Sequence, residues 1–253
     1  MDLGLKGKRV VVTGGTRGIG RAIAEAFAAE GANVAICARN AGEVDETVAS
    51  LKAKGVQASG AVVDIGEREA YQGWIAKAAE TLGGIDVFVA NVSAGGGGMD
   101  ESAWRANFEV DLLGTTRGIE AAMPALKASG AGAIVIISST AAVETFIAPQ
   151  PYNAIKAALV TYAKQLSQAV GADGIRVNCV SPGPIYFPGG AWQHIEQNMP
   201  QLFEGTRAQI PRGSLGKPEE VANAVVFLAS PAASLITGVN LVADGGFTKR
   251  VQL

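Results

Sequence analysis

Residues Arg9–Phe27 read RVVVTGGTRGIGRAIAEAF, and this stretch decides the fold. An apolar, β-branched run meets a cluster of glycines, and a segment with helical spacing follows, in which Ile19, Ile23 and Phe27 recur every four residues. A strand that passes through glycines into a helix lets backbone N–H groups approach a pyrophosphate, and the helix N-terminus adds partial positive charge. The stretch therefore predicts a dinucleotide-binding turn.

The glycines of this turn do not follow the common G-x-G-x-x-G order. They are Gly14, Gly15, Gly18 and Gly20. We expect the first two to make the tight turn, the third to allow close approach of a ligand, and the fourth to let the helix pack. The loop is longer than the common form, which would give the side chains of Thr16 and Arg17 access to the ligand. A strand–helix turn without any ligand can show the same glycines, so their spacing alone leaves binding open.

Further apolar runs alternate with helical segments along the chain. The expected strands are Val10–Thr13, Val34–Ala38, Ala61–Asp64, Val87–Ala90, Ile134–Ser138, Arg176–Val180 and Asn240–Val242. Continuous apolar strands alternating with helices predict a parallel sheet covered on both faces, and right-handed crossovers make it doubly wound. The fold class is therefore α/β, a Rossmann-like sheet of about seven strands with helices on both faces. No linker or repeat divides the chain, so residues 1–253 are expected to form one domain.

Composition limits the classes of function. Hydrophobic residues make up 48% of the 253 residues and charged residues 17%, and the net charge of −2 argues against a nucleic-acid partner. Cys37 and Cys179 lie in strand-like runs, as small core residues of a protein in a reducing compartment do. There is no signal-peptide h-region and no apolar run of membrane-spanning length, so we expect a soluble, cytoplasmic protein. We expect no metal, because His194 is the only histidine and both cysteines sit in strands.

The second half of the chain carries groups suited to proton transfer. Tyr152 and Lys156 lie four residues apart in a segment that opens with Pro151 and reads as a helix, so their side chains share one helix face. An ammonium beside a phenol favours the phenolate, and a tyrosine tuned in this way can protonate a ketone oxygen or deprotonate an alcohol. Ser139 follows the preceding strand and could reach the same oxygen. A surface tyrosine beside a solvated lysine is the alternative.

Taken together, these motifs resemble the short-chain dehydrogenase/reductase family nearly from end to end. TGGTRGIG resembles its T-G-x-x-x-G-x-G cofactor loop, and YNAIK resembles its Y-x-x-x-K, with Ser139 thirteen positions before the tyrosine. VVDIGE resembles the stretch whose aspartate, here Asp64, bonds the adenine, and RVNCVSPGPI and ITGVNLVADGG resemble the late strands.

The resemblance implies a role for each matching residue. Tyr152 would be the general acid/base, Lys156 would favour its phenolate and bond the nicotinamide ribose, and Ser139 would orient the substrate oxygen. Hydride would move between the nicotinamide and the carbonyl carbon. Cofactor contacts are implied for Gly14, Thr16, Arg17, Gly18, Ile19, Gly20, Arg39, Asp64, Ile65, Asn91, Tyr152, Lys156, Pro182, Gly183 and Ile185.

The chain departs from the family pattern at three places. Its ANVS keeps only Asn91 of the family's N-N-A-G, and PGPIYFPGG lacks the threonine that commonly follows the P-G motif. Asp111 stands where the family usually has a catalytic asparagine, which holds a relay water largely through its main-chain carbonyl. Because that carbonyl survives, we expect Asp111→Asn to retain activity within about tenfold. A carboxylate would also favour the ammonium form of Lys156, unless Asp111 points away from the site.

The cofactor expected is NADP(H) in preference to NAD(H). An acidic residue after the second strand would bond the ribose 2′-OH of NAD, but Ala38 occupies that place and Arg39 follows it. Together with Arg17, Arg39 could clamp a 2′-phosphate. Two exposed, merely solubilising arginines are the alternative.

A substrate lid is expected at about residues 184–212. Its side chains include Tyr186, Phe187, Trp192, Met199 and Phe203, and such walls suit an apolar ketone or secondary alcohol unless they pack on the domain or a neighbouring subunit. By resemblance, the chain forms a homotetramer. The function expected is a carbonyl reductase or alcohol dehydrogenase. A dinucleotide sensor without turnover, a 3-oxoacyl thioester reductase, and a lyase or isomerase on the same scaffold remain alternatives.

Overall fold

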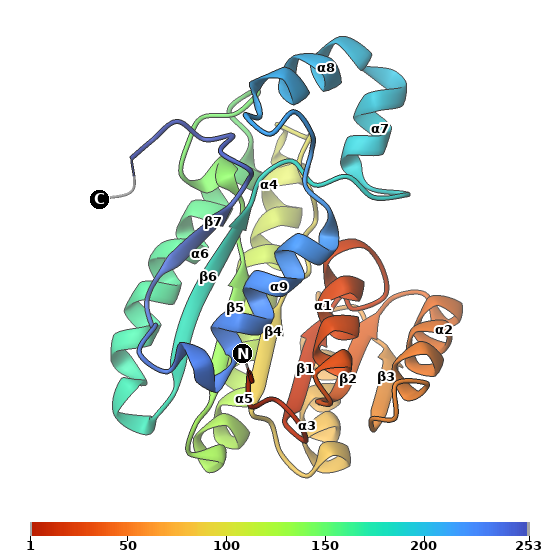
Figure 1. Ribbon diagram of the computed structural model, residues 1–253, viewed down its shortest axis with the longest axis vertical. Coiled ribbons are helices and arrows are strands. Elements are labelled where there is room, and N and C mark those ends of the chain that lie inside the picture. Colours follow the sequence, from red (N-terminus) through yellow and green to blue (C-terminus); the bar gives the residue numbers. More distant parts are fainter. Residues whose placement is uncertain (1, 252–253) are drawn as a thin grey trace.

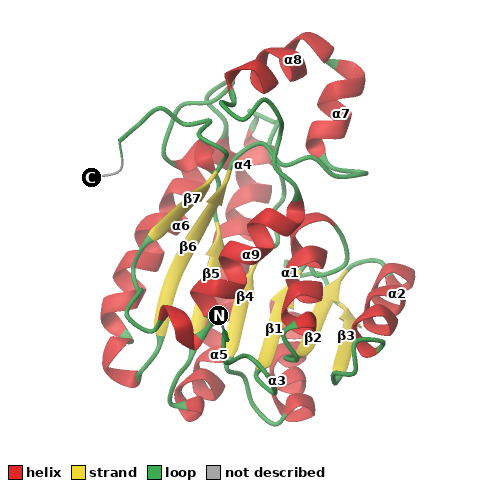
Figure 2. Ribbon diagram, viewed as in Figure 1, coloured by secondary structure: helices red, strands yellow, loops and turns green. Residues whose placement is uncertain are grey.

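The apolar runs form one parallel sheet. In the computed structural model, which describes residues 2–251, seven strands pair in the order β3-β2-β1-β4-β5-β6-β7, all parallel (Figure 2). They are β1 Arg9–Thr13, β2 Asn33–Ala38, β3 Ala58–Val62, β4 Val87–Ala90, β5 Ala133–Ile137, β6 Arg176–Pro182 and β7 Asn240–Ala243. The doubly wound parallel sheet predicted from the sequence is confirmed.

β3 is displaced from its predicted bounds by two or three residues at each end, whereas the other strands match theirs to within two residues. β3 begins at Ala58 and ends at Val62, because it pairs with β2 from Ala58 opposite Val34 to Val62 opposite Ala38. Its sequence, ASGAV, is poor in β-branched residues, so the prediction placed the strand too late, at Ala61–Asp64. Asp64 consequently lies in the loop beyond the strand.

Helices cover both faces of the sheet (Figure 1). α1, α2 and α9 pack on one face and α3, α5 and α6 on the other. The helices are α1 Gly18–Ala29, α2 Ala41–Lys52, α3 Arg68–Leu82, α4 Glu101–Asn107, α5 Gly114–Ser129, α6 Pro151–Ala169, α7 Ala191–Asn198, α8 Pro200–Gln209 and α9 Pro218–Ala229. A π-helical turn, Phe108–Leu113, joins α4 to α5, and a 3₁₀ turn, Thr140–Ala142, follows β5.

The predicted apolar stripe of α1 is what holds it to the sheet. Ile23 and Phe27 are fully buried and pack in one cluster with β1, β2 and α9. Burial of a side chain of this size contributes roughly 1.5–3 kcal/mol. On the opposite face, Cys37 and Cys179 are buried and free, as expected of core cysteines.

The strand order reverses between β1 and β4, which opens a crevice at their carboxyl ends where ligands of such sheets bind. α7 and α8 stand at this end of the molecule, at the top of Figure 1. Within residues 2–251, no helix is both long enough and apolar enough to cross a membrane.

Candidate active site

The glycine loop between β1 and α1 has the shape of an anion cradle. Gly14 adopts a φ of 64°, and a Cβ on Gly20 would lie 2.0 Å from the Gly14 carbonyl oxygen, so a side chain fits at neither place. No side chain caps the N-terminus of α1, whose N-cap is Arg17, and its first turn holds no acidic residue. The open N–H groups and the helix dipole therefore fit a pyrophosphate.

Asn91, at the end of β4, braces this loop. Its side-chain amide donates to the carbonyl oxygens of Thr13 (3.0 Å) and Gly14 (3.2 Å), and its backbone N–H donates to Thr13 Oγ1 (2.9 Å). The amide thus holds the first turn against the neighbouring strand. This position is the one residue that the chain keeps of the family's N-N-A-G.

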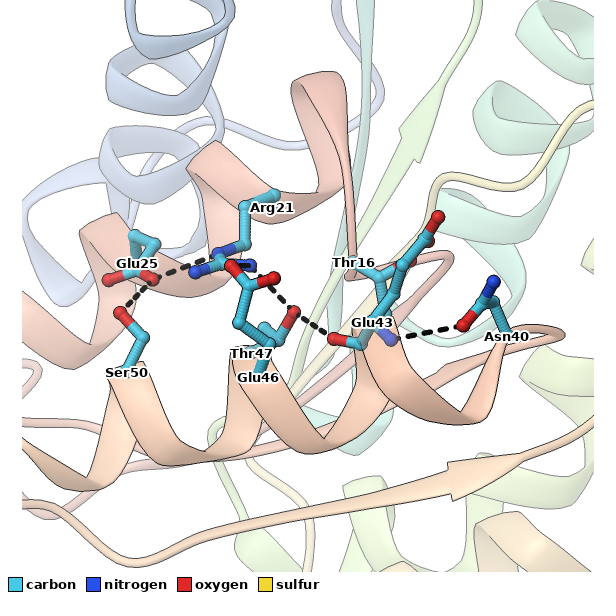
Figure 3. Close-up of polar contacts among 8 residues, drawn as sticks. All are labelled: Thr16, Arg21, Glu25, Asn40, Glu43, Glu46, Thr47 and Ser50. Carbon is cyan, nitrogen blue, oxygen red and sulfur yellow. Dashed lines mark hydrogen bonds and ion pairs between the residues drawn. The ribbon is translucent and has the colours of Figure 1, made fainter. Parts of the chain in front are cut away.

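A polar network joins α1 to α2 beside the loop (Figure 3). Thr16 is buried, and its hydroxyl donates to Glu43 Oε2 at 2.8 Å, so this side chain faces α2. Arg21 donates to Thr47 Oγ1 at 2.9 Å and to Glu25 Oε1 at 3.0 Å. The network ties α2 to the glycine loop and to α1.

Two arginines without an ion-pair partner among the described residues lie beside the glycine loop and the N-terminal end of α2. Arg17 and Arg39 are both exposed, and no ion pair within residues 2–251 involves either one. In the loop after β3, Asp64 is also exposed, and its carboxylate accepts from the N–H of Gly66 at 2.9 Å. The next residue, Ile65, is buried in the core instead.

Tyr152 and Lys156 share one face of α6, as their spacing predicted. Lys156 Nζ lies 5.6 Å from the centre of the Tyr152 ring and donates to the Ile137 carbonyl oxygen at 3.0 Å. Lys156 is 2% exposed, whereas Tyr152 is half-buried. Ser139 follows β5, and its Oγ accepts from the N–H of Ala141 at 3.1 Å. That bond leaves the hydroxyl proton of Ser139 free to donate to a substrate oxygen.

Asp111 points into the site. It is fully buried on the π-helical turn, its Oδ1 lies 3.0 Å from Lys156 Nζ, and its Oδ2 accepts from the N–H of Ala94 at 2.8 Å. An orientation away from the site, left open by the sequence, is therefore wrong. The π-helical turn widens the helix at this residue, a distortion that often marks functional sites.

The segment after β6 runs over the glycine loop. Pro182 ends the strand, the N–H of Gly183 donates to the Ala243 carbonyl oxygen at 3.0 Å, and Ile185 is buried in the core. Phe187 packs against Gly18, where a Cβ would meet its ring at 2.5 Å. Cavities of about 430 and 660 Å³ flank Phe187.

Residues of the predicted lid segment form an aromatic cluster. Phe203 is buried with Tyr186 and Trp192 packed against it, and Trp192 also contacts Phe146 from the loop between Ser139 and Tyr152. Met199 is exposed and stands apart from this cluster.

The sequence analysis missed the role of the glycine-rich loop after β4. A Cβ on Gly96 would lie 2.9 Å from Gln150 Oε1 and 3.7 Å from Tyr152 Cγ, and Gln150 Oε1 accepts from the N–H of Gly97 at 2.7 Å. The loop therefore packs against the tyrosine. A run of four glycines gave no signal for this contact, because the pattern is also that of a flexible loop.

Comparison with known proteins decides the family. A family model described as enoyl-(acyl carrier protein) reductase matches residues 14–248. The chain is 41% identical over 246 residues to an isoepoxydon dehydrogenase of Aspergillus clavatus, covering 96% of this chain and 95% of the relative. The chain belongs to the short-chain dehydrogenase/reductase family. A further member, dehydrogenase/reductase SDR family member 4 of Oryctolagus cuniculus, is 38% identical over 98% of this chain and 96% of its own length.

A solved structure agrees with this assignment. L-sorbose reductase from Gluconobacter frateurii, complexed with NADPH and L-sorbose, superposes with a TM-score of 0.91 and 33% identity over 99% of this chain and 100% of that one. As a short-chain dehydrogenase/reductase, the protein is an oxidoreductase that acts on carbonyl and alcohol groups.

Proposed function

We propose that the protein is an NADP(H)-dependent oxidoreductase that interconverts an apolar ketone and its secondary alcohol, with Tyr152 as the acid/base. The observation that carries the proposal is the half-buried Tyr152 with the buried Lys156 ammonium 5.6 Å from its ring. A protein that only sensed a dinucleotide would have no use for a phenol held beside an ammonium.

The site residues divide the proton work between them. In reduction, the Tyr152 hydroxyl donates a proton to the carbonyl oxygen while the Ser139 hydroxyl donates a hydrogen bond to the same oxygen. The positive charge of Lys156 then stabilises the phenolate that remains. In oxidation the phenolate removes the alcohol proton.

The residues of the glycine loop fit the cofactor. The uncapped N-terminus of α1 would hold the pyrophosphate, Asp64 the adenine, and Arg17 and Arg39 the 2′-phosphate. When bound, the nicotinamide supplies or accepts the hydride. The NADPH complex of the sorbose reductase supports this class of cofactor.

The nature of the substrate rests on the wall of the crevice. Phe146, from the loop before α6, and Trp192 and Phe203, from the lid segment, pack together in tilted contacts. Aromatic walls with few charges favour an apolar ketone. L-sorbose, bound by the structural neighbour, is polar, so a substrate panel has to hold both classes.

The test of the proposal is turnover with and without the phenol. We expect the purified protein to oxidise NADPH with a panel of apolar ketones faster than with sugars or hydroxy acids. Tyr152→Phe should lower kcat/KM by about a thousandfold or more while the Kd for NADPH stays nearly unchanged. Turnover of Tyr152→Phe at the wild-type rate would refute the role of Tyr152, and preference for a sugar would refute the apolar substrate.

A further inference from the structure

The surroundings of Asp111 call for a carboxylate and not for an amide. The N–H of Ala94 bonds Oδ2 at 2.8 Å, and Oδ1, which accepts no hydrogen bond from the residues that the structure describes, lies 3.0 Å from Lys156 Nζ as an ion pair. A carboxylate offers two acceptor oxygens, whereas an asparagine amide offers one oxygen and an NH₂ group that would face a donor. Asp111 is therefore matched to its partners as an anion.

Asp111 and Lys156 are the buried charges next to Tyr152. The π-helical turn brings Asp111, and β5 contributes only the carbonyl oxygen of Ile137 to Lys156. The 3₁₀ turn on the other side, Thr140–Ala142, has no ionisable side chain. The remaining titratable groups on elements packed against α6 near this end are the Glu101–Arg105 pair of α4, the Glu109–Arg117 pair and the thiol of Cys179 on β6.

Those remaining groups add no net charge at the site. The Glu101–Arg105 pair lies toward solvent and the Glu109–Arg117 pair is partly buried, and each is neutral as a pair. Burial raises the pKa of the Cys179 thiol to about 12, although the charge of Lys156 lowers it, so the thiol stays neutral. Among these groups, Lys156 is the charge in contact with the Tyr152 ring, and Asp111 is its ion-pair partner.

We propose that Asp111 is a positioning residue that anchors Lys156 and offsets its positive charge at Tyr152, so that the phenol keeps its proton to higher pH than it would with asparagine at position 111. A cation paired with an anion 3.0 Å away acts on a third group as a dipole, whose potential falls off faster than that of a lone charge. The protonated phenol is the form that donates to a ketone, so the pairing favours reduction near neutral pH. This inference rests on the proposed role of Tyr152 in proton transfer.

The first test is the pH profile of alcohol oxidation. We expect Asp111→Asn to move the rising limb of kcat/KM to lower pH by about one unit, because the ammonium then acts on the phenol without its counter-charge. Glu109→Gln is the matched control, since it removes a carboxylate from the same helical turn without touching Lys156. Its profile should coincide with that of the wild type. An unchanged profile in Asp111→Asn, or a shift to higher pH, overturns the inference.

The second test needs no turnover. The absorbance of phenolate is followed as a function of pH in the wild type and in Asp111→Asn. The same titration is run on Tyr152→Phe and on the double variant Asp111→Asn/Tyr152→Phe. Subtracting the second set from the first gives the signal of Tyr152 in each protein. The other three tyrosines interfere little: burial raises the pKa of Tyr71 and of Tyr162, and the hydrogen bond to Glu196 raises that of Tyr186. We expect the Tyr152 signal to appear at lower pH in Asp111→Asn.

The two tests separate the inference from the proposed function. If the phenolate signal shifts but the protein turns over neither ketones nor alcohols, the inferred effect of Asp111 on Tyr152 stands and the proposed oxidoreductase function is refuted. If the Tyr152 signal appears at the same pH in the folded wild type and in folded Asp111→Asn, the inferred effect of Asp111 on Tyr152 is overturned, whether or not the protein is active. If circular dichroism shows that Asp111→Asn does not fold, Asp111→Ala is titrated in its place with the same expected shift, and an unshifted signal there overturns the inference.

Discussion

Arg39 is the residue through which the proposed preference for NADP(H) can be tested. It is exposed beside the N-terminal end of α2, where Glu43 is occupied by the hydroxyl of Thr16. A guanidinium can bond a 2′-phosphate with two parallel N–H groups, and NAD(H) lacks that phosphate. We therefore expect Arg39→Ala to weaken NADPH binding by about tenfold or more and to leave NADH binding nearly unchanged, as measured by fluorescence titration of both cofactors.

The control for this change is Arg105→Ala. It removes one exposed positive charge from α4, where Arg105 is paired with Glu101. Both Kd values should stay at their wild-type level. Wild-type affinity for NADPH in Arg39→Ala, or tighter binding of NADH than of NADPH by the wild type, would end the claim of NADP(H) preference.

Single residues also show how much of the candidate site can be predicted from the sequence. The spacing of Tyr152 and Lys156 predicted their shared helix face, since a helix repeat fixes which residues lie together. The contact of Asp111 with Lys156 and Ala94 could not be read in this way. It joins three separate parts of the chain and depends on a π-helical turn that no residue pattern marks.

At the scale of elements, strand periodicity predicted the sheet. The side-chain ion pairs that join neighbouring strands were seen only in the structure. Arg9 at the start of β1 donates from Nε to Asp86 Oδ2 and from Nη2 to Oδ1, both at 2.7 Å, just before β4. These residues are 77 positions apart. The residues around Arg9 or Asp86 do not indicate that the two side chains pair. The apolar runs that form β1 and β4, by contrast, can each be recognised from a few consecutive residues.

The Arg9–Asp86 pair predicts a dependence of stability on pH. Burial alone would raise the pKa of Asp86, but hydrogen bonds from Arg9 outweigh it and hold that pKa below its ordinary value. A carboxyl with a lowered pKa in the folded state stabilises the fold above its unfolded pKa of about 4. That contribution is lost as the pH falls through the folded pKa.

We therefore expect Asp86→Asn to lower the free energy of unfolding at pH 7 by about 2 kcal/mol. The difference from the wild type should narrow as the pH falls below about 4, because the carboxyl of the unfolded wild type then takes up a proton while that of the folded protein, with its lower pKa, is still ionised. Urea denaturation at several pH values measures both effects. Glu101→Gln, which removes an exposed ion pair, should change the free energy little at any pH. An Asp86→Asn deficit that is independent of pH would show that the pair acts through packing alone.

For the whole molecule, exposed apolar side chains predict how copies assemble. One group lies around α4 and the π-helical turn, with Met99, Trp104 and Phe108 exposed by 62%, 46% and 48%. Another lies at and before β7, where Leu235 is 96% exposed and Leu241 38%. β7 is also an edge strand of the sheet, with β6 as its partner, and exposed edges invite pairing with another chain.

Two separate self-complementary patches, each used across a two-fold axis, generate a tetramer with three mutually perpendicular axes. We therefore expect light scattering at micromolar concentration to give a mass four times that of the chain. Leu235→Asp should leave dimers joined through the α4 patch, and Trp104→Asp should leave dimers joined through β7. Lys77→Asp, on the surface of α3, is the control and should remain a tetramer. A monomeric wild type would contradict the assembly, and a dimeric wild type would show that only one of the two patches is used.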